Sequence, residues 1–317
     1  MPKVSLTAMD KVEILTLQDN YIEMTAMDNN AVITRAAPLK EGEIRASILA
    51  EHGFSALIKT TAAGKAHTLL FDFGFSEDGA AQNAKTLGVD MRDVEAAALS
   101  HGHSDHTGGL QKLTELIGKR DIPLLVHPSA FKSPRYLKFG EDFKINFPQL
   151  TREMVKEAGF SAIESATPYP LLDDTILFLG EIPRKTDFEE GFPIAHWQKD
   201  GQELWDAIED DTSIVMNLKD KGLVIVSGCA HAGIVNTVQY AMEVTGIDNV
   251  HVVMGGFHLS GPLFEAIIDR TSQELQKVHP AYIVPMHCTG RKAIMAMEKQ
   301  MPNQFILNMA GTKLTFA

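Results

Sequence analysis

A short apolar segment that leads directly into a cluster of metal-binding side chains constrains the fold of this chain more than any other feature. Val94–Ser100 (VEAAALS) has the length and composition of a strand that is buried on both faces. Residues 101–106 follow at once with the sequence HGHSDH. Imidazole nitrogens and carboxylate oxygens bind divalent transition metals. A metal site at the end of a buried strand is therefore predicted, in preference to a surface loop that is rich in histidine by chance.

The order of residues within HGHSDH favours two ions. In an extended turn, His101 and His103 point the same way because side chains alternate along the backbone. Asp105 and His106 lie beyond the bend, where they can face a second ion. The glycines at 102, 108 and 109 are expected to let the backbone pass close to the ions.

Three apolar segments in the second half also end in ligand-type residues: Gly222–Ser227 precedes Cys229 and His231, Val250–Met254 precedes His258, and Ala281–Pro285 precedes His287 and Cys288. Functional groups gather at the carboxyl ends of strands in open α/β sheets, so these residues are expected to converge. One histidine after a strand is more often structural, and a cysteine is more often a small buried residue. Three such strand ends in succession favour a site. The remaining histidines are interpreted as structural or surface residues: His52, His67, His127, His196, His251 and His279.

Strands and helices alternate along the chain. Strands are predicted at 43–50, 54–60, 67–71, 94–100, 122–127, 213–218, 222–227, 250–254 and 281–285, and helices at 110–118, 234–244, 262–278 and 291–300. This order favours an α/β fold in which two β-sheets pack face to face with helices outside. Residues 1–317 are interpreted as a single domain. Residues 128–170, which are rich in proline and aromatic residues, are interpreted as a lid-like insertion over a pocket.

The charge balance excludes some classes of partner. The chain has 29 Lys and Arg residues against 41 Asp and Glu residues, a formal net charge of −12. Binding to a nucleic-acid backbone needs a basic surface, so no nucleic-acid partner is expected. No apolar run is long enough to span a membrane, and no apolar signal core begins the sequence. Two cysteines exclude a disulfide framework, and a cytoplasmic location is expected.

Helix starts near the same strand ends suggest an anionic ligand. Helices that begin near Gly233, Gly261 and Gly290 would direct backbone N–H groups at the crevice, which favours a phosphate. Thr289, Gly290 and Arg291 are therefore candidate phosphate-binding residues. Ordinary helix capping explains the same residues equally well.

The segment HGHSDH matches the H-x-H-x-D-H motif, and the chain thereby resembles the metallo-β-lactamase superfamily. Asp72 in LLFDFG and His287 in VPMHC stand where that superfamily has its earlier strand-end Asp and its last metal-binding His. The segments 227–237 (SGCAHAGIVNT), 254–261 (MGGFHLSG) and 285–291 (PMHCTGR), with Asp19-Asn20, resemble the dihydropterin–ribofuranosylaminobenzene 5′-phosphate synthase-like branch. The resemblance implies an αβ/βα four-layer sandwich and a dinuclear metal site.

The resemblance also implies roles for single residues. The implied metal ligands are His101, His103, Asp105, His106, His231 and His287. Asp105 is further expected to orient the attacking group, and His258 to act as a ligand or proton donor. Two departures leave the third ligand of each ion open. Residues 208–216 (IEDDTSIVM) lack the usual histidine, which Asp210 or Asp211, or alternatively His231 or His258, could replace. Cys229 stands in place of the usual bridging Asp.

These residues are consistent with three hypotheses about the function. The first is a metal-dependent enzyme acting on a phosphorylated, pterin-related small molecule, by condensing dihydropterin pyrophosphate with ribofuranosylaminobenzene 5′-phosphate or by a variant of that reaction. The second is a dinuclear metal hydrolase of phosphodiesters, lactones or thioesters. The third is a catalytically silent ligand-binding or sensing module. The expected cofactors are two divalent ions, zinc first and manganese or iron as alternatives. A homo-oligomer is left open.

Overall fold

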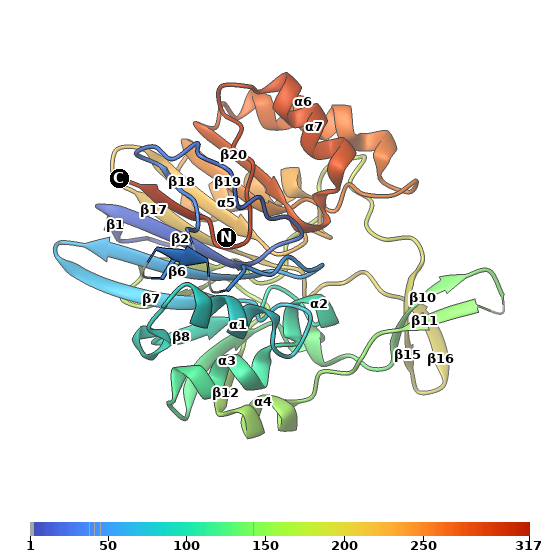
Figure 1. Ribbon diagram of the computed structural model, residues 1–317. Coiled ribbons are helices and arrows are strands. Elements are labelled where there is room, and N and C mark those ends of the chain that lie inside the picture. The colour runs from blue at the N-terminus through green and yellow to red at the C-terminus, as the bar shows by residue number, and fades with distance from the viewer. Residues whose placement is uncertain (1–2, 38, 41, 45, 142) are drawn as a thin grey trace.

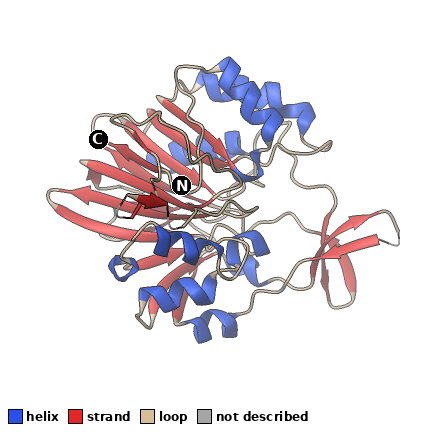
Figure 2. Ribbon diagram, in the orientation of Figure 1, coloured by secondary structure: helices blue, strands red, loops and turns tan. Residues whose placement is uncertain are grey.

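The computed structural model describes residues 3–37, 39–40, 42–44, 46–141 and 143–317. Two large β-sheets lie face to face, and helices cover the outer face of each (Figures 1 and 2). The eight-stranded sheet contains, in spatial order, β12 (Phe160–Glu164), β9 (Ile122–Val126), β8 (Ala96–Ala98), β7 (Lys65–Phe71), β6 (Ser55–Ala62), β2 (Lys11–Gln18), β21 (Lys313–Phe316) and β3 (Ile33–Thr34). The predicted four-layer α/β sandwich is thereby confirmed.

The second large sheet has seven strands. Its spatial order is β13 (Tyr169–Leu171), β14 (Ile176–Phe178), β17 (Ser213–Leu218), β18 (Gly222–Ser227), β19 (Val250–Gly256) and β20 (Tyr282–Met286), and β1 (Ala8–Met9) pairs in parallel with β17. Strands β18, β19 and β20 are parallel neighbours, and so are β7, β8 and β9 in the other sheet. Their carboxyl ends therefore reach the same edge of the sandwich.

Alternation along the central strands explains the layers. On β18, Val224 and Val226 face the core between the two sheets, whereas Leu223 and Ile225 belong to an outer core. The outer core lies beneath α5 (Ile234–Thr245), α6 (Ile268–Lys277) and α7 (Arg291–Gln300). A third core lies beneath α1 (Gly79–Thr86), α3 (Leu110–Ile117) and α4 (Arg152–Ala158) on the other sheet. A strand with both faces buried must be apolar throughout, as β18 is.

A small four-stranded sheet extends from one side of the sandwich, at the right in Figure 1. It contains β11 (Phe143–Asn146), β10 (Arg135–Phe139), β15 (Ala195–Lys199) and β16 (Gln202–Trp205). The predicted boundaries of a lid at 128–170 are therefore wrong. Of the described residues in this range, only those of β10 and β11 enter this sheet, while α4 and β12 complete the larger layers because Val155 and Phe160 pack in the third core.

Two further predicted elements differ from the structure. The expected strand at 43–50 is reduced to β5 (Glu43–Ile44), which pairs with β4 (Leu39–Lys40); residues 46–50 form no strand, and residue 45 lies outside the described part of the chain. The helix expected from 262 begins only at Ile268, after a 3₁₀ turn over Glu265–Ile267. Among the described residues, none of the helices combines the length and apolar character needed to cross a membrane.

Candidate metal centre

The HGHSDH loop is held by a buried carboxylate from the neighbouring strand end. Asp72, directly after β7, accepts hydrogen bonds from the backbone N–H of Ser100 (2.7 Å) and from its hydroxyl (2.6 Å). The same carboxylate lies 2.6 Å from Nδ1 of His106, which leaves Nε2 of that ring facing Cys229 Sγ at 3.1 Å. Burial lowers the pKa of His106, but the carboxylates of Asp105 and Asp72 outweigh it and raise the pKa to about 9.

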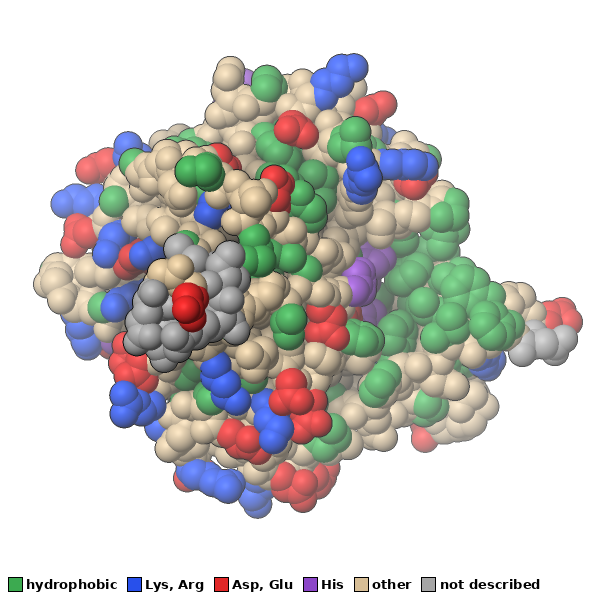
Figure 3. All heavy atoms as spheres, in the orientation of Figure 1, with side chains coloured by type: hydrophobic (Ala, Val, Ile, Leu, Met, Phe, Trp, Pro, Cys, Tyr) green, Lys and Arg blue, Asp and Glu red, His purple; other side chains and the backbone are tan. Residues whose placement is uncertain are grey.

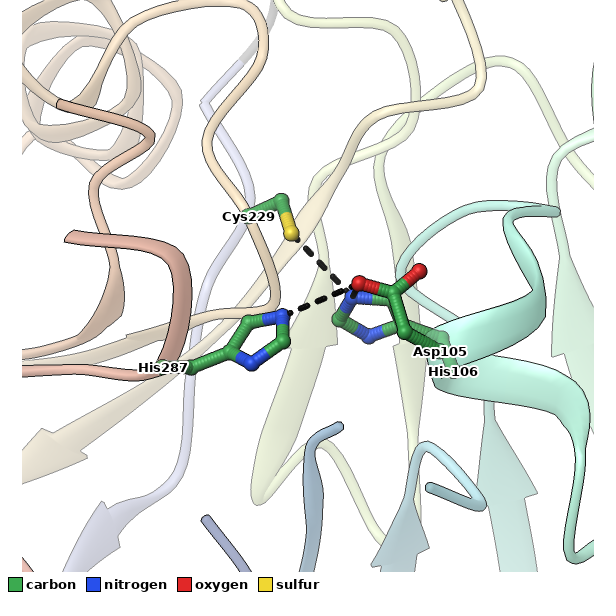
Figure 4. A group of neighbouring side chains, drawn as sticks. All are labelled: Asp105, His106, Cys229 and His287. Carbon is green, nitrogen blue, oxygen red and sulfur yellow. Dashed lines mark hydrogen bonds and ion pairs between the residues drawn. The ribbon is translucent and has the colours of Figure 1, made fainter. Parts of the chain in front are cut away.

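Four overlapping groups of side chains could hold a metal ion, and within each group the ligand atoms lie within 4.8 Å of one another. The first ligand group is Asp105, His106, Cys229 and His287, and the second is His101, Cys229 and His231. The third is His101, His103 and Asp105, and the fourth is Cys229, His258 and Cys288. Figure 4 shows the first ligand group, in which α2 (Ser104–Thr107) and the segments after β18 and β20 present their side chains to one point. Each of the six implied ligands belongs to at least one group.

The buried nitrogens of these rings test whether a metal would fit. Nε2 of His103 and both nitrogens of His231 are buried and lack a hydrogen-bond partner, whereas Nε2 of His287 lies 3.3 Å from Asp105 Oδ2. A buried polar atom without a partner costs roughly 1–3 kcal/mol, so several in one place indicate a missing ligand. The set consists of imidazole, carboxylate and thiol groups, which are the donors of zinc and related ions. The residues therefore fit a divalent metal.

Most of these imidazoles are held in the form that binds metal. Burial, with help from the Arg135 guanidinium, lowers the pKa of His103 to about 3. Burial and neighbouring imidazoles lower the pKa of His101 and of His231 well below the usual range. A metal ion binds the neutral imidazole, so these three rings need lose no proton to bind near neutral pH.

Residues near the amino terminus orient His287. Asn20 Oδ1 lies 3.2 Å from Nδ1 of His287, and the Asn20 amide donates to the His287 carbonyl at 3.0 Å. Asp19 accepts the His287 backbone N–H at 3.0 Å. His52 also lies at this rim: its Nδ1 is 3.0 Å from the Asn20 amide and its Nε2 is 3.8 Å from Asp105. His52 is exposed, in agreement with its interpretation as a structural or surface residue, but it lies at the rim of the candidate centre, which the sequence did not indicate.

The small sheet contacts the histidine loop through a buried ion pair. Arg135 on β10 donates two hydrogen bonds of 2.9 Å to Asp210, whose Oδ2 accepts the backbone N–H of Gly102 at 2.8 Å. The Phe147 ring, just beyond β11, stacks on His103 with centroids 4.4 Å apart. Asp210 therefore pairs with Arg135 and holds the histidine loop in position. The sequence alone gave no signal for either contact, because both partners come from distant segments.

Asp211 and Thr289 lie near the centre without belonging to a ligand group. Asp211 accepts the Ala232 N–H at 2.9 Å, and burial raises its pKa to about 7. The Thr289 hydroxyl accepts the Phe257 N–H at 3.0 Å and faces the Gly255 carbonyl at 3.4 Å. The Thr289 hydroxyl is therefore already engaged by the protein, whereas Asp211 keeps one buried oxygen, Oδ1, without a hydrogen-bond partner.

The expected anion site at the start of α5 is occupied by the protein itself. The carboxylate of Glu189 accepts the N–H groups of Val235 and Asn236, each at 2.9 Å. Gly261 does not begin a helix, as stated above. Of the three expected helix starts, the one at Gly290 remains: Gly290 is the N-cap of α7, and Arg291 is exposed in its first turn.

The glycines of the histidine loop have a different role from the one expected. A Cβ at residue 108 would lie 1.6 Å from the carbonyl oxygen of Phe75, and one at residue 102 would lie 2.3 Å from that of Ala130. Glycine is needed at both positions because neighbouring backbone occupies the space that a Cβ would take.

Cavities open on two sides of the ligand groups. The first cavity, of about 600 Å³, is lined by His231 and His258 and by the aromatic rings of Phe192, Trp205 and Phe264. The second cavity, of about 650 Å³, is lined by His287, Asn20, Arg291 and residues of α7. Figure 3 shows histidine side chains in a hollow beside a hydrophobic patch.

Comparison with known proteins agrees with this geometry. The sequence model of the metallo-β-lactamase superfamily matches residues 50–187. The 7,8-dihydropterin-6-methyl-4-(β-D-ribofuranosyl)-aminobenzene-5′-phosphate synthase of Methanocaldococcus jannaschii is 32% identical over 274 residues, which cover 84% of this chain and 90% of that protein. An uncharacterised protein of the same organism is 32% identical over 275 residues, covering 83% and 92% of the two chains.

Solved structures show the same fold. A crystal structure described as a metal-dependent hydrolase of the β-lactamase superfamily superposes with a TM-score of 0.70 at 22% identity, covering 96% of this chain and 98% of the other. A metallo-β-lactamase fold protein from Bacillus subtilis gives a TM-score of 0.51 at 11% identity, covering 97% and 100%. This chain belongs to the metallo-β-lactamase superfamily, in the branch that contains the dihydropterin–ribofuranosylaminobenzene 5′-phosphate synthase-like proteins.

Proposed function

We propose that this protein is a metal-dependent enzyme that acts on a phosphorylated, pterin-related small molecule. The observation that carries the proposal is the set of buried imidazole nitrogens that lack a hydrogen-bond partner and face one another at the strand ends. Bound ions would satisfy these atoms, which otherwise destabilise the fold. The 32% identity to a named synthase supports the pterin-related substrate class.

Two divalent ions are proposed, with zinc favoured because imidazole ligands predominate. We propose His101, His103 and His231 for one ion, because His101 shares one ligand group with His103 and another with His231. Asp105, His106 and His287, which share the first ligand group, are proposed for the other ion. When bound, such ions stabilise negative charge on a pyrophosphate leaving group or lower the pKa of a water molecule. A cytoplasmic location is part of the proposal, since both cysteines are free thiols.

The chain's own residues supply orientation and proton transfer. Asp72 fixes the ring of His106, and Asn20 fixes the ring of His287. Because the two rings are held in one orientation, their ligand atoms are ready to bind a metal. Asp105 is proposed to orient the attacking group. His258 is proposed to hold or move a proton at Nδ1, which is buried without a partner, while its ring lines the first cavity.

The two cavities support a condensation in preference to a hydrolysis. A reaction that joins two organic substrates needs two sites beside the ions, whereas hydrolysis needs one site and water. Phe192 and Phe264 in the first cavity offer ring faces to a flat heterocycle. Arg291 and the first turn of α7 in the second cavity offer positive charge and N–H groups to a phosphate.

Product analysis tests the proposal. Purified protein with its metal content measured is incubated with dihydropterin pyrophosphate, with and without ribofuranosylaminobenzene 5′-phosphate. We expect a new product, with a carbon–nitrogen bond between the pterin methylene carbon and the amine of the aminobenzene, and released pyrophosphate only when both substrates are present, and no product with His103→Ala. Pyrophosphate release that does not depend on the second substrate would support the hydrolase hypothesis instead. Binding of either compound without turnover would support the ligand-binding hypothesis.

A further inference from the structure

A histidine on the side of the sandwich opposite the ligand groups lies between two carboxylates. His67 is near the amino end of β7, whereas the ligand groups lie beyond the carboxyl ends of the parallel strands. Its Nδ1 is 3.0 Å and 3.2 Å from the two oxygens of Glu95, and its Nε2 is 3.2 Å from Asp173 Oδ2. We propose that His67 is a pH-sensitive latch between the two large sheets, which closes when its ring gains a second proton and opens when that proton is lost.

The two carboxylates come from different sheets. Glu95 directly precedes β8 in the eight-stranded sheet, and Asp173 lies in the turn between β13 and β14 in the seven-stranded sheet. The buried His67 ring therefore connects the two sheets. Thr60, which pairs with His67 across β6 and β7, makes a second connection, because its hydroxyl donates to the Thr175 hydroxyl at 3.1 Å. Both connections end on the same turn.

The turn that receives these contacts has an unfavourable backbone conformation. Leu172, Asp173 and Asp174 have φ values of 52°, 57° and 58°, in the left-handed region. Residues other than glycine rarely adopt this conformation, which persists only where surrounding contacts maintain it. Thr7 donates to the Asp173 carbonyl from its hydroxyl and to the Asp174 carbonyl from its N–H, each at 3.0 Å. His67 holds the side chain of Asp173, so the latch acts on a segment that depends on external support.

The hydrogens on the ring decide how many contacts the latch makes. A carboxylate accepts hydrogen bonds and does not donate them, so each nitrogen of His67 must carry its own hydrogen to bond both partners. The imidazolium ring has two such hydrogens, whereas the neutral ring has one and directs a lone pair at the other carboxylate. The latch therefore stabilises the junction while the ring is charged, and this stabilisation is lost as the pH rises.

Lys65 determines which contact is lost. It lies two residues before His67 and pairs with Asp173, so this carboxylate keeps a cation after the ring becomes neutral. The hydrogen bond from Lys65 also lowers the pKa of Asp173, which remains ionised while histidine titrates. Glu95 forms no ion pair with a lysine or arginine among the described residues. The neutral ring is therefore expected to keep its hydrogen towards Glu95 and to lose the hydrogen bond to Asp173, which is the one between the sheets.

Amide hydrogen exchange of the full chain between about pH 5 and 8, where histidine changes charge, tests the latch. We expect the protection factors of amides in β14 and in the turn before it to fall about 2–10-fold as the pH rises, the effect of one hydrogen bond. His67→Gln and Asp173→Asn should have the lower protection throughout, with little change. His251→Gln is the control and should keep the full pH dependence, because this histidine lies against Tyr282 and Phe316 and has no ion pair among the described residues.

Nitrogen NMR of the His67 ring in the natural chain gives a decision that does not depend on variants. We expect hydrogens on both nitrogens at the acidic end of the range, and loss of the Nε2 hydrogen as the pH rises. A ring whose hydrogens do not change, or a pH dependence of protection that persists in His67→Gln, would overturn the latch. So would loss of that dependence in His251→Gln, which would indicate a general effect of pH on the seven-stranded sheet. The proposed function stands apart from these outcomes, because the ligand groups lie on the opposite side of the sandwich.

Discussion

At the scale of single residues, Asn20 links the amino-terminal segment to the metal centre. Its two contacts with His287 fix both the ring and the backbone of that ligand. Loss of a group that orients a ligand typically weakens metal binding about 10–100-fold, and we expect this for Asn20→Ala. Competition with a chromophoric chelator measures the change. The exposed Asn303 gives the control Asn303→Ala, and equal affinities in the two variants would contradict the assigned role.

Single residues also show where sequence patterns stop being informative. The ligand-type residues that follow strands could be predicted from the sequence because those strands are apolar and short. His52 was missed because it follows no buried strand and reaches the centre through Asn20, which is 32 positions away in the sequence. Asp210 was considered as a ligand, yet its charge is matched by Arg135 from another element. Pairing between distant polar residues leaves no local pattern to detect.

At the scale of elements, the turns after the strands depart from ordinary backbone geometry. Asp72, Ala230, His258 and His287 all have positive φ, between 46° and 60°. Such a conformation is unfavourable for residues other than glycine and concentrates at functional sites, where surrounding contacts maintain it. The sequence predicted which strands end at the site. It could not predict these turns, because none of the four positions is a glycine.

The contact between β10 and the histidine loop gives an element-scale prediction. Arg135→Met leaves Asp210 buried without its cation and leaves Asp206 with only Lys132 at 3.7 Å, and we expect a loss of about 3–5 kcal/mol in the free energy of unfolding. Urea unfolding measures it. Arg92→Met breaks a two-bond pair with Asp90 on the exposed surface and serves as the control, with a far smaller expected effect. Equal losses in the two variants would show that burial of the Arg135 pair has no consequence.

The small sheet is expected to open in acid. Hydrogen bonds from Lys138, Lys144 and Tyr136 lower the pKa of Glu203 from 4.5 to about 2. A depressed carboxyl pKa stabilises the folded form above pH 4.5, and that stabilisation is lost as the pH falls towards 2. The protection factors of amides in β10, β11 and β16, which are corrected for the intrinsic effect of pH on exchange, should therefore fall over this range. In Glu203→Gln the same amides should exchange faster already at neutral pH, with a weaker dependence on acid.

At the scale of the whole molecule, the sandwich is the part of the structure that sequence patterns predicted best. Continuous apolar strands such as β18 require cover on both faces, and that requirement alone selects layers of helix and sheet. The small sheet was harder to predict. Its strands come from 135–146 and 195–205, and β16 is exposed along its whole length, so neither hydrophobic periodicity nor proximity in the sequence indicates that they pair.

The ligand groups join the two halves of the sandwich, so metal removal should destabilise the molecule as a unit. His101 follows β8 in one sheet, whereas His231 and His287 follow β18 and β20 in the other. An ion at 100 times its dissociation constant adds about 2.7 kcal/mol to the stability of the folded state. We expect a chelator to lower the midpoint of thermal unfolding, with β8 and β18 amides losing protection together in hydrogen exchange. The variant carrying both His103→Ala and His287→Ala should already unfold at the lower temperature and should not respond to the chelator. A chelator response confined to one sheet would mean that the ions do not connect the two halves.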